Sequence, residues 1–346
     1  MKKKSIAVLL VSMAALIMSA CNSGGTATAT GGQSQPGSGT AAESQETQPE
    51  EKDPHQITFV LKSLGSNYWV QLKAGAVDKA AELGVKLEVL APSSDNATED
   101  QIRMLEDQVV SGADLVLVAP SNSGAQMATF DKVVDAGIPL ICVDTNAKDY
   151  QKKTAFIGSS NEEVGRQAGE YLAEKVEDKS GAVIILRGQL GDETADTRSK
   201  GCTEALKAAG FTDIIEQPAS NDRNTAMGVM ENMLQSNDHI VAVYGTNDEM
   251  ALGAARALQS GDSQDIVVVG TNADVDALTS IVEHTGVTAS VRQDPYTMGA
   301  TAVEMAVACL EGETVEAVVN IPVRVIDIEE AKDTLDAVNA VLNAAK

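Results

Sequence analysis

The sequence has few residues of the kinds that bind metals or cross-link a chain. Its 346 residues include three histidines and four cysteines, and no two cysteines are spaced as C-x-x-C. A zinc site needs several such ligands close together, so we predict no metal and no other cofactor. Cys142 falls in an apolar strand and Cys309 in an alanine-rich helix. Buried free thiols are the preferred interpretation, and a disulfide between these two cysteines remains open.

Positive charge is also scarce. The chain has 26 Lys and Arg against 50 Asp and Glu, which gives a formal net charge of −24. A nucleic-acid-binding surface needs a basic face, so the composition argues against nucleic acid as a partner.

Motifs of the common enzyme classes are missing as well. The sequence has no G-x-S-x-G elbow, no P-loop, and no G-x-G-x-x-G after its first strand. Carboxylates such as Asp144 and Asp248 imitate a glycosidase pair, yet hydrogen bonding to hydroxyl groups explains them without catalysis. We therefore expect a protein that is not an enzyme, with a carbohydrate-active enzyme as the weaker alternative.

The N-terminus carries a targeting signal. Residues 1–4 are Met-Lys-Lys-Lys, and an apolar stretch over residues 6–18 follows. That stretch is too short to span a membrane stably, and a basic start before it is typical of a secretory signal peptide. We therefore predict a signal peptide over residues 1–20.

A lipid anchor is predicted directly after it. Met18-Ser19-Ala20-Cys21 resembles the bacterial lipobox, in which the cysteine is lipidated and becomes the new N-terminus, although methionine replaces the usual leucine. Residues 21–55 are rich in Gly, Ser, Thr, Gln and Glu, which predicts a flexible tether after Cys21. The domain that follows is expected outside the cytoplasm, attached to the cell membrane through the lipid on Cys21.

From Ile57 onward, short apolar strands alternate with amphipathic helices. Strands are predicted over 57–61, 85–90, 115–118, 139–143 and 155–157, and after Ser159 over 182–186, 213–216, 240–244 and 266–269. Strict alternation with short turns predicts parallel sheets covered by helices on both faces. About 290 residues is long for one core, so we predict an α/β protein with two doubly wound parallel-sheet lobes and a cleft between them.

One stretch shows where a ligand would bind. The apolar run over residues 240–244 stops at Gly245, and Thr-Asn-Asp then opens a helical segment. Asn247 and Asp248 therefore lie at a strand-to-helix turn, on the carboxyl edge of a parallel sheet where ligands bind. The alternative is that they only cap the helix. Other predicted strands end in polar residues of the same kind.

A family resemblance rests on five stretches. They are residues 68–76, 137–144, 247–255, 267–272 and 293–295, among which Asn-Asp-Glu-Met-Ala-Leu-Gly is the specific one. Through them the chain from Ile57 to about Val325 resembles the type I periplasmic sugar-binding proteins of ABC transporters, of the ribose-binding kind. The resemblance implies three hinge crossings, near Ser159, Gln293 and Arg324.

It also implies a division of the chain into two discontinuous lobes. The N-terminal lobe would comprise residues 56–159 plus 294–324, and the C-terminal lobe residues 160–293 plus 325–346. The segment from Pro295 to Leu310 would form a helix of the first lobe, although it follows the second lobe in sequence.

A sugar presents hydroxyl groups that both donate and accept, and apolar C–H faces, so its recognition needs carboxylates, amides and an aromatic ring. The polar partners are predicted at strand ends or at a hinge: Asp144, Asn247, Asp248, Asn272 and Gln293. Tyr68 and Trp69 are predicted to cover a sugar face, with unequal roles because adjacent helical residues point in different directions. Core packing is the alternative for one of the two.

Three further positions depart from the ribose-type pattern. Lys62 stands where a small polar residue is usual, and it would donate to hydroxyls or neutralise Asp144. Asp196, followed by Arg198, stands where the pattern has an arginine, and Asn221 stands where it has an aromatic residue. These changes make ribose itself doubtful as the ligand and favour another pentose, a hexose, a cyclic polyol or a ligand with a positive group.

The resemblance implies a lipid-anchored, monomeric receptor that binds a sugar or polyol, closes about its hinges and delivers the solute to the permease of an ABC importer. A chemosensory or furanose autoinducer receptor is the alternative that the sequence leaves open. Calcium binding at residues 272–276 lacks the glycine and distal glutamate of a calcium loop, so a turn that caps a helix is preferred there.

Overall fold

The computed structural model describes residues 54–95, 97–188, 193–259 and 266–345. The predicted signal peptide, Cys21 and nearly all of the predicted tether lie outside these ranges. Strands and helices alternate along the described chain, and the strands assemble into two sheets. Within the described ranges, no helix is both long and apolar enough to cross a bilayer.

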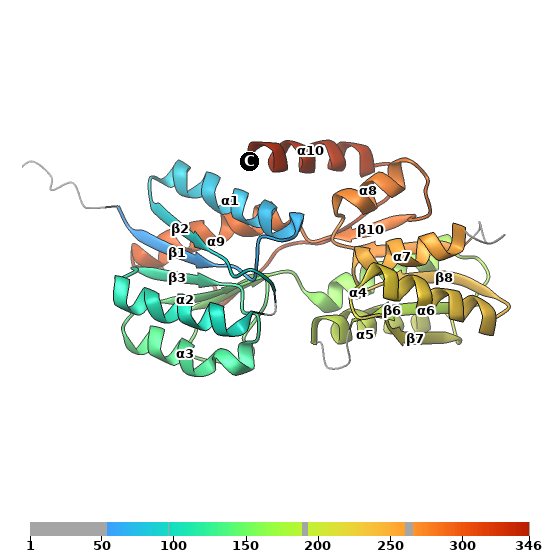
Figure 1. The fold of residues 1–346 in the computed structure, drawn as a ribbon, viewed down its shortest axis with the longest axis horizontal. Coiled ribbons are helices and arrows are strands. Elements are labelled where there is room, and N and C mark those ends of the chain that lie inside the picture. The colour runs from blue at the N-terminus through green and yellow to red at the C-terminus, as the bar shows by residue number, and fades with distance from the viewer. Residues whose placement is uncertain (1–53, 96, 189–192, 260–265, 346) are drawn as a thin grey trace, which may run out of the picture. The chain divides into compact units, whose positions relative to one another are not determined.

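The first sheet contains six described strands, and every neighbouring pair in it is parallel. Across the sheet the order is β11 (Val318–Asn320), β5 (Ala155–Gly158), β4 (Leu140–Val143), β3 (Leu115–Val118), β1 (Gln56–Val60) and β2 (Lys86–Leu90). Helices α1 (Asn67–Leu83) and α9 (Pro295–Leu310) cover one face, and α2 (Thr98–Ser111) and α3 (Ser123–Asp135) cover the other (Figure 1).

The second sheet repeats this design with one exception. Its described strands run in the order β12 (Arg324–Ile326), β10 (Ala289–Arg292), β9 (Val267–Thr271), β8 (Ile240–Gly245), β6 (Ala182–Arg187) and β7 (Ile214–Pro218). All neighbours are parallel except β10 and β12, which are antiparallel. Helices α4 (Asn161–Lys175) and α5 (Glu193–Ala208) cover one face, and α6 (Arg223–Ser236) and α7 (Asp248–Gln259) cover the other.

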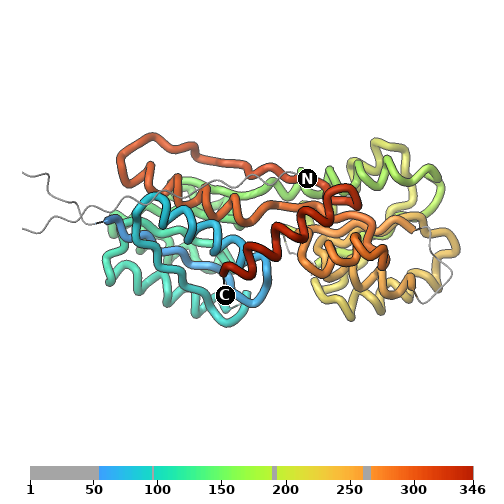
Figure 2. The backbone as a smooth tube through the Cα atoms, turned by 90° about the horizontal axis from the view of Figure 1, so that it is seen from above, coloured from blue at the N-terminus to red at the C-terminus, as the bar shows by residue number. Residues whose placement is uncertain are grey.

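Two more helices complete the second sheet. Helices α8 (Val275–Val282) and α10 (Ala331–Ala344) pack against each other in a separate apolar cluster. Helix α10, drawn in dark red in Figure 2, also contacts α1. The predicted α/β class with two doubly wound parallel-sheet lobes is confirmed.

The sheets are apolar on both faces because each is covered twice. In β3, Leu115 and Leu117 pack beneath α1 and α9, whereas Val116 and Val118 pack beneath α2 and α3. All four side chains are fully buried, and each such burial stabilises the fold by roughly 1.5–3 kcal/mol. This explains why the strands read as continuous apolar runs rather than as alternating ones.

The chain passes between the two sheets three times. It leaves the first sheet after β5, returns after β10, and leaves again between β11 and β12. The helix predicted from Pro295 to Leu310 is confirmed as α9, and it packs on the first sheet although it follows β10. The hydroxyl of Ser159 on the first passage donates to the carbonyl of Gln293 on the second at 3.3 Å.

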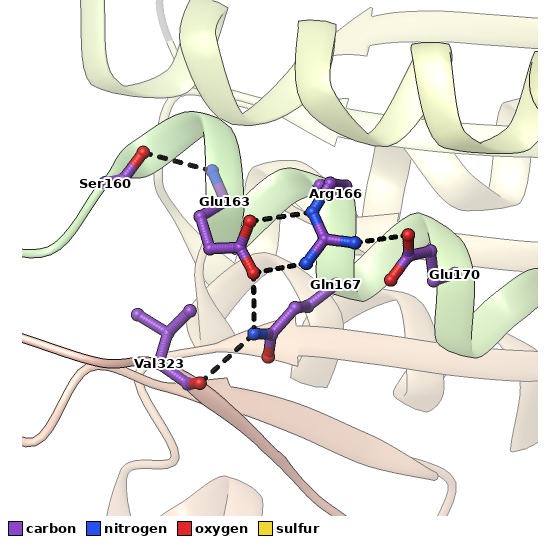
Figure 3. Close-up of polar contacts among 6 residues, drawn as sticks. All are labelled: Ser160, Glu163, Arg166, Gln167, Glu170 and Val323. Atoms are coloured by element: carbon purple, nitrogen blue, oxygen red, sulfur yellow. Dashed lines mark hydrogen bonds and ion pairs between the residues drawn. The ribbon is translucent and has the colours of Figure 1, made fainter.

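A polar cluster opens α4 just after the first passage (Figure 3). The hydroxyl of Ser160 caps the helix by accepting a hydrogen bond from the backbone N–H of Glu163 at 3.3 Å. Arg166 Nε donates to Glu163 Oε2 at 2.7 Å. Gln167 Nε2 donates both to Glu163 Oε1, at 2.9 Å, and to the carbonyl of Val323, at 3.1 Å. The bond from Gln167 to Val323 ties α4 to the third passage.

The structure shows whether the described cysteines form a disulfide. Cys142, Cys202 and Cys309 are free thiols, so the disulfide that the sequence left open is not formed. Burial raises the pKa of Cys142 to about 11, which keeps that thiol protonated.

Candidate functional site

The first sheet contributes an aromatic and acidic pair at the carboxyl end of its strands. The Tyr68 hydroxyl, on the first turn of α1, donates to Asp144 Oδ1 at 2.6 Å. Thr145 Oγ1 donates to the other carboxylate oxygen of Asp144 at 2.8 Å. Burial, and then the charge of Asp144, raise the pKa of Tyr68, so the phenol stays a donor. Asp144 follows β4 with a φ of 64°, which turns the chain sharply as the strand ends.

Trp69 has a different set of neighbours from Tyr68, as expected for adjacent helical residues. Its indole packs edge-on against the Tyr68 ring, with centroids 5.2 Å apart, and its Nε1 donates to Asp95 Oδ2 at 3.4 Å. Lys62 Nζ lies 5.8 Å from the centroid of the Trp69 ring, at cation–π distance. Tyr68 and Trp69 are 7% and 5% exposed, so both also belong to the core beneath α1.

The second sheet contributes an amide pair at the ends of two adjacent strands. Gln293 Nε2 donates to Asn272 Oδ1 at 2.9 Å. Asn272 follows β9 and Gln293 follows β10, where the chain passes back to the first sheet. The structure therefore brings together two predicted site residues that are 21 positions apart.

Asn247 caps a helix, which is one of the two roles that the sequence left open. Its Oδ1 accepts a hydrogen bond from the backbone N–H of Met250 at 2.9 Å, which caps α7. Its Nδ2 donates to Asn221 Oδ1 at 3.4 Å. Asn221 follows β7 with a φ of 58°, so the two amides meet at the ends of β7 and β8.

Asp248 lies at the predicted strand-to-helix turn, as the first residue of α7, and its carboxylate is buried. It is 1% exposed, and its oxygens accept hydrogen bonds from Ser290 Oγ at 2.6 Å and from the backbone N–H of Asp274 at 2.7 Å. A Cβ added to Gly270 would lie 2.2 Å from Asp248 Oδ1, so glycine at that position leaves room for the carboxylate. Burial raises the pKa of Asp248. Asp248 therefore joins the start of α7 to the loop after β9 and to β10.

Asp196 and Arg198 each contact other groups of the protein. Asp196 forms an ion pair with Arg187, at the end of β6, a partner that the sequence analysis missed. Arg198 is 7% exposed, and its Nε and Nη1 donate to Asn161 Oδ1 and to the carbonyl of Thr246, each at 2.9 Å. Arg198 thus joins α5 to the start of α4 and to the end of β8.

A polar cavity of about 220 Å³ adjoins Asp144. Its walls come from the ends of β4, β5 and β11 and from the starts of α4 and α5, with Thr145, Phe156, Ser159, Asn161, Glu193 and Asn320 among them. Asp144 is the predicted site residue in this lining. The strand-end rule, applied to β5 and β11 as well, would have found Ser159 and Asn320. A second hollow, of about 710 Å³ between α7 and α8, contains none of the predicted residues.

The chemistry of these groups is that of hydrogen bonding. Amides, a phenol and a carboxylate gather at the carboxyl ends of both sheets, and they offer donors and acceptors but no activated nucleophile. Among the described residues, no group of three or more His, Cys, Asp or Glu side chains has the geometry of a metal site.

Comparisons with known proteins agree with this architecture. A sequence model of the periplasmic binding protein domain matches residues 57–314. The ribose import binding protein of Salmonella typhimurium LT2 is 35% identical over 261 residues, which cover 75% of this chain and 86% of the relative. The D-allose-binding periplasmic protein of Escherichia coli K12 is 33% identical over 260 residues, or 73% of this chain and 83% of the relative.

Solved structures give the same result in three dimensions. A solute-binding protein from Actinobacillus succinogenes 130z with bound D-allose has a TM-score of 0.74 at 26% identity, over 81% of this chain and 99% of that one. A solute-binding protein from Bacillus halodurans C-125 with bound myo-inositol has a TM-score of 0.73 at 27% identity, over 83% and 99% of the two chains.

Proposed function

This chain belongs to the periplasmic binding protein domain family, and from that premise we propose that it is the substrate-binding protein of an ABC importer for a neutral sugar or polyol. The relatives named above are binding proteins for ribose or allose, or solute-binding proteins with allose or inositol bound. The protein would bind its solute between the two sheets and release it to a permease.

One observation carries the proposal. Hydrogen-bonded polar pairs stand at the carboxyl ends of the strands in both sheets, Tyr68 with Asp144 in the first and Asn272 with Gln293 in the second. In open parallel sheets this edge is where ligands bind. Amides and carboxylates are also the groups that match hydroxyls, since each hydroxyl donates one hydrogen bond and accepts others.

The ligand set that we propose follows from these contacts. Tyr68, Asp144, Asn272 and Gln293 form its centre, and Asn221 and Asn247 contribute a third polar pair. Lys62 and Trp69 cover one side of the solute. Asp196 and Arg198 act indirectly, because their charged groups are already bound to Arg187, Asn161 and Thr246.

Closure about the three passages couples binding to delivery. Solute contacts from both sheets can form together only in a closed state, so binding shifts the equilibrium between open and closed states by the difference in affinity. The lobes that move would be residues 56–159 plus 294–324 and residues 160–293 plus 325–346. A permease that recognises the closed form would then receive the solute.

Attachment to the membrane completes the proposal. Lipid on Cys21 and the tether over residues 21–55 would hold a monomeric domain at the outer face of the cell membrane. Labelling cells with a radioactive fatty acid tests this directly. The full chain should incorporate label and the Cys21→Ser chain should not; equal labelling of both would contradict the anchor.

A binding screen tests the function. The secreted form from residue 22 onward is heated with D-ribose, D-allose, D-arabinose or myo-inositol, and hits are titrated by calorimetry. A solute at a hundred times its Kd should stabilise the fold by about 2.7 kcal/mol. Binding without chemical turnover of the solute supports an importer's receptor. Turnover would favour an enzyme. The absence of a stability change with every neutral sugar and polyol would contradict the proposal.

A further inference from the structure

Seven buried side-chain atoms of the described chain lack a protein hydrogen-bond partner, and two of them, of opposite character, belong to residues next to the Asn272–Gln293 pair in sequence. They are Nη1 of Arg292, a donor, and Oδ1 of Asp274, an acceptor. Arg292 directly precedes Gln293, and Asp274 lies two residues after Asn272. Burying a polar group without a partner is costly, and more so for a charged one, so such a pair calls for an explanation.

The rest of the Arg292 guanidinium is firmly held. Its Nη2 donates to Gln71 Oε1 at 3.1 Å and lies 3.8 Å from Asp294 Oδ1. Gln71 is 2% exposed and belongs to the first turns of α1, next to Tyr68 and Trp69. The Arg292 side chain is itself only 10% exposed. The guanidinium is therefore fixed on one side and keeps Nη1 for another partner.

The topology puts both atoms at the same edge of the second sheet. Strands β9 and β10 are parallel neighbours, with Thr271 opposite Val291. Asp274 follows β9 and Arg292 ends β10, so both stand at the carboxyl ends of their strands. The charge of Asp274 also helps to raise the pKa of Tyr68, so this edge lies within electrostatic reach of the aromatic pair on α1.

The charges of the two groups narrow the choice of solute. Arg292 keeps its positive charge, because guanidinium groups in proteins are effectively always protonated. Burial raises the pKa of Asp274 and the charge of Arg292 opposes that rise, so the guanidinium favours the carboxylate form of Asp274. An anionic solute would meet Asp274 and Asp144, and a cationic one would meet Arg292. A hydroxyl suits both, since its oxygen accepts from a guanidinium while its proton is donated to a carboxylate.

We propose that Arg292 and Asp274 bind the solute directly, as a donor and acceptor pair that selects one hydroxyl, or two adjacent hydroxyls, of a neutral sugar or polyol. Nη1 of Arg292 donates to a hydroxyl oxygen, and Oδ1 of Asp274 accepts a hydroxyl proton. Gln71 is a positioning residue that holds the guanidinium. This inference rests on the proposed function and adds two residues that the strand-end rule passed over.

The test uses solutes that lack one hydroxyl each. Whichever neutral sugar or polyol of the screen binds the secreted form from residue 22 is titrated by calorimetry, together with its monodeoxy analogues. The same titrations are made with Arg292→Gln and with Arg103→Gln. Arg103 is the matched control, because it lies on α2, is 66% exposed and pairs with Asp100.

We expect Arg292→Gln to weaken binding at least tenfold, as loss of a charge-assisted hydrogen bond does, and Arg103→Gln to change it less than twofold. One deoxy analogue should bind the wild type at least tenfold more weakly than the parent solute, yet bind Arg292→Gln as well as the parent does. If Arg292 had only a structural role, removal of each hydroxyl from the solute would weaken binding to Arg292→Gln by the same factor as it weakens binding to the wild type. Asp274→Asn repeats the comparison if Arg292→Gln does not fold, and the penalty of the same analogue should shrink.

Two results would overturn the inference. In the first, the wild type binds a sugar but the variants bind it within twofold or keep every deoxy penalty, so the inference falls while the proposed function stands. In the second, the wild type binds no neutral sugar or polyol of the screen, and both fall.

Discussion

The phenol of Tyr68 donates a 2.6 Å hydrogen bond to Oδ1 of Asp144 and thereby joins the first turn of α1 to the carboxyl end of β4. Both residues belong to the first sheet and its helices, so the bond does not depend on a solute or on the passages between the sheets. It fixes the direction of a carboxylate that also borders the 220 Å³ cavity. A binding surface that is ordered in advance loses less entropy when a solute arrives.

Replacing Tyr68 with Phe should therefore reduce both stability and solute affinity. Loss of this buried hydrogen bond should lower the free energy of unfolding by about 1 kcal/mol, because Asp144 loses a donor. Affinity for the bound sugar should fall severalfold, since Asp144 is no longer held in one orientation. Urea unfolding and calorimetric titration measure the two effects.

Tyr296→Phe is the matched control. The hydroxyl of Tyr296 donates to Asp78 Oδ2 at 2.7 Å, but on an exposed surface. Its removal should cost less stability and leave sugar affinity unchanged. Equal sugar affinity in Tyr68→Phe and the wild type would contradict a role for Tyr68 in the site.

Helices α1 and α9 approach each other closely at two glycines. A Cβ on Gly75 of α1 would lie 1.9 Å from the carbonyl oxygen of Tyr296, and one on Gly299 of α9 would lie 2.0 Å from that of Leu72. Gly75→Ala should push the helices apart and lower the free energy of unfolding by roughly 2–3 kcal/mol, as overpacking does. Thermal or urea unfolding reports the change.

A second glycine in a helix serves as the comparison. A Cβ on Gly228 of α6 would meet no atom within 4 Å. Gly228→Ala should therefore stabilise the protein by roughly 0.5–1 kcal/mol through helix propensity alone. If Gly75→Ala stabilised the protein to the same extent, the close packing of α1 on α9 would be refuted.

Much of the fold could be predicted from the sequence because its signals are local. Apolar runs, glycine-closed helices and strict alternation depend on neighbouring residues, and they gave the class and most elements. The strand-end rule likewise located Asn272, and the hinge position that the family resemblance implied located Gln293. It could not show that Asp248 is buried, because its partner Ser290 lies 42 residues away and the space beside it depends on Gly270. The ion pair of Asp196 could not be predicted for the same reason, because its partner Arg187 belongs to another element.

The loop after β9 should make stability depend on pH. Burial raises the pKa of Asp274 to about 6, above the value of about 3.9 expected for an unfolded chain. The folded state therefore holds the proton more tightly, and the free energy of unfolding should fall as pH rises from about 4 to about 6. The contribution is roughly 1–3 kcal/mol. Urea unfolding at pH 4.5 and pH 7 measures it.

Substitution separates this contribution from the general charge of the protein. Asp274→Asn should make the difference in stability between the two pH values smaller, because the amide does not titrate. Asp213→Asn, at an exposed position, should leave that difference as in the wild type. The same pH dependence in wild type and Asp274→Asn would show that Asp274 is not the titrating group.

Closure on solute binding is measured most directly by small-angle X-ray scattering. The secreted form is titrated with the sugar that binds most tightly in the screen. The radius of gyration should fall as sugar is added, with a midpoint at the Kd found by calorimetry, because solute contacts from both sheets favour a closed state. A sugar that binds with the same Kd and leaves the scattering curve unchanged would contradict closure about the three passages.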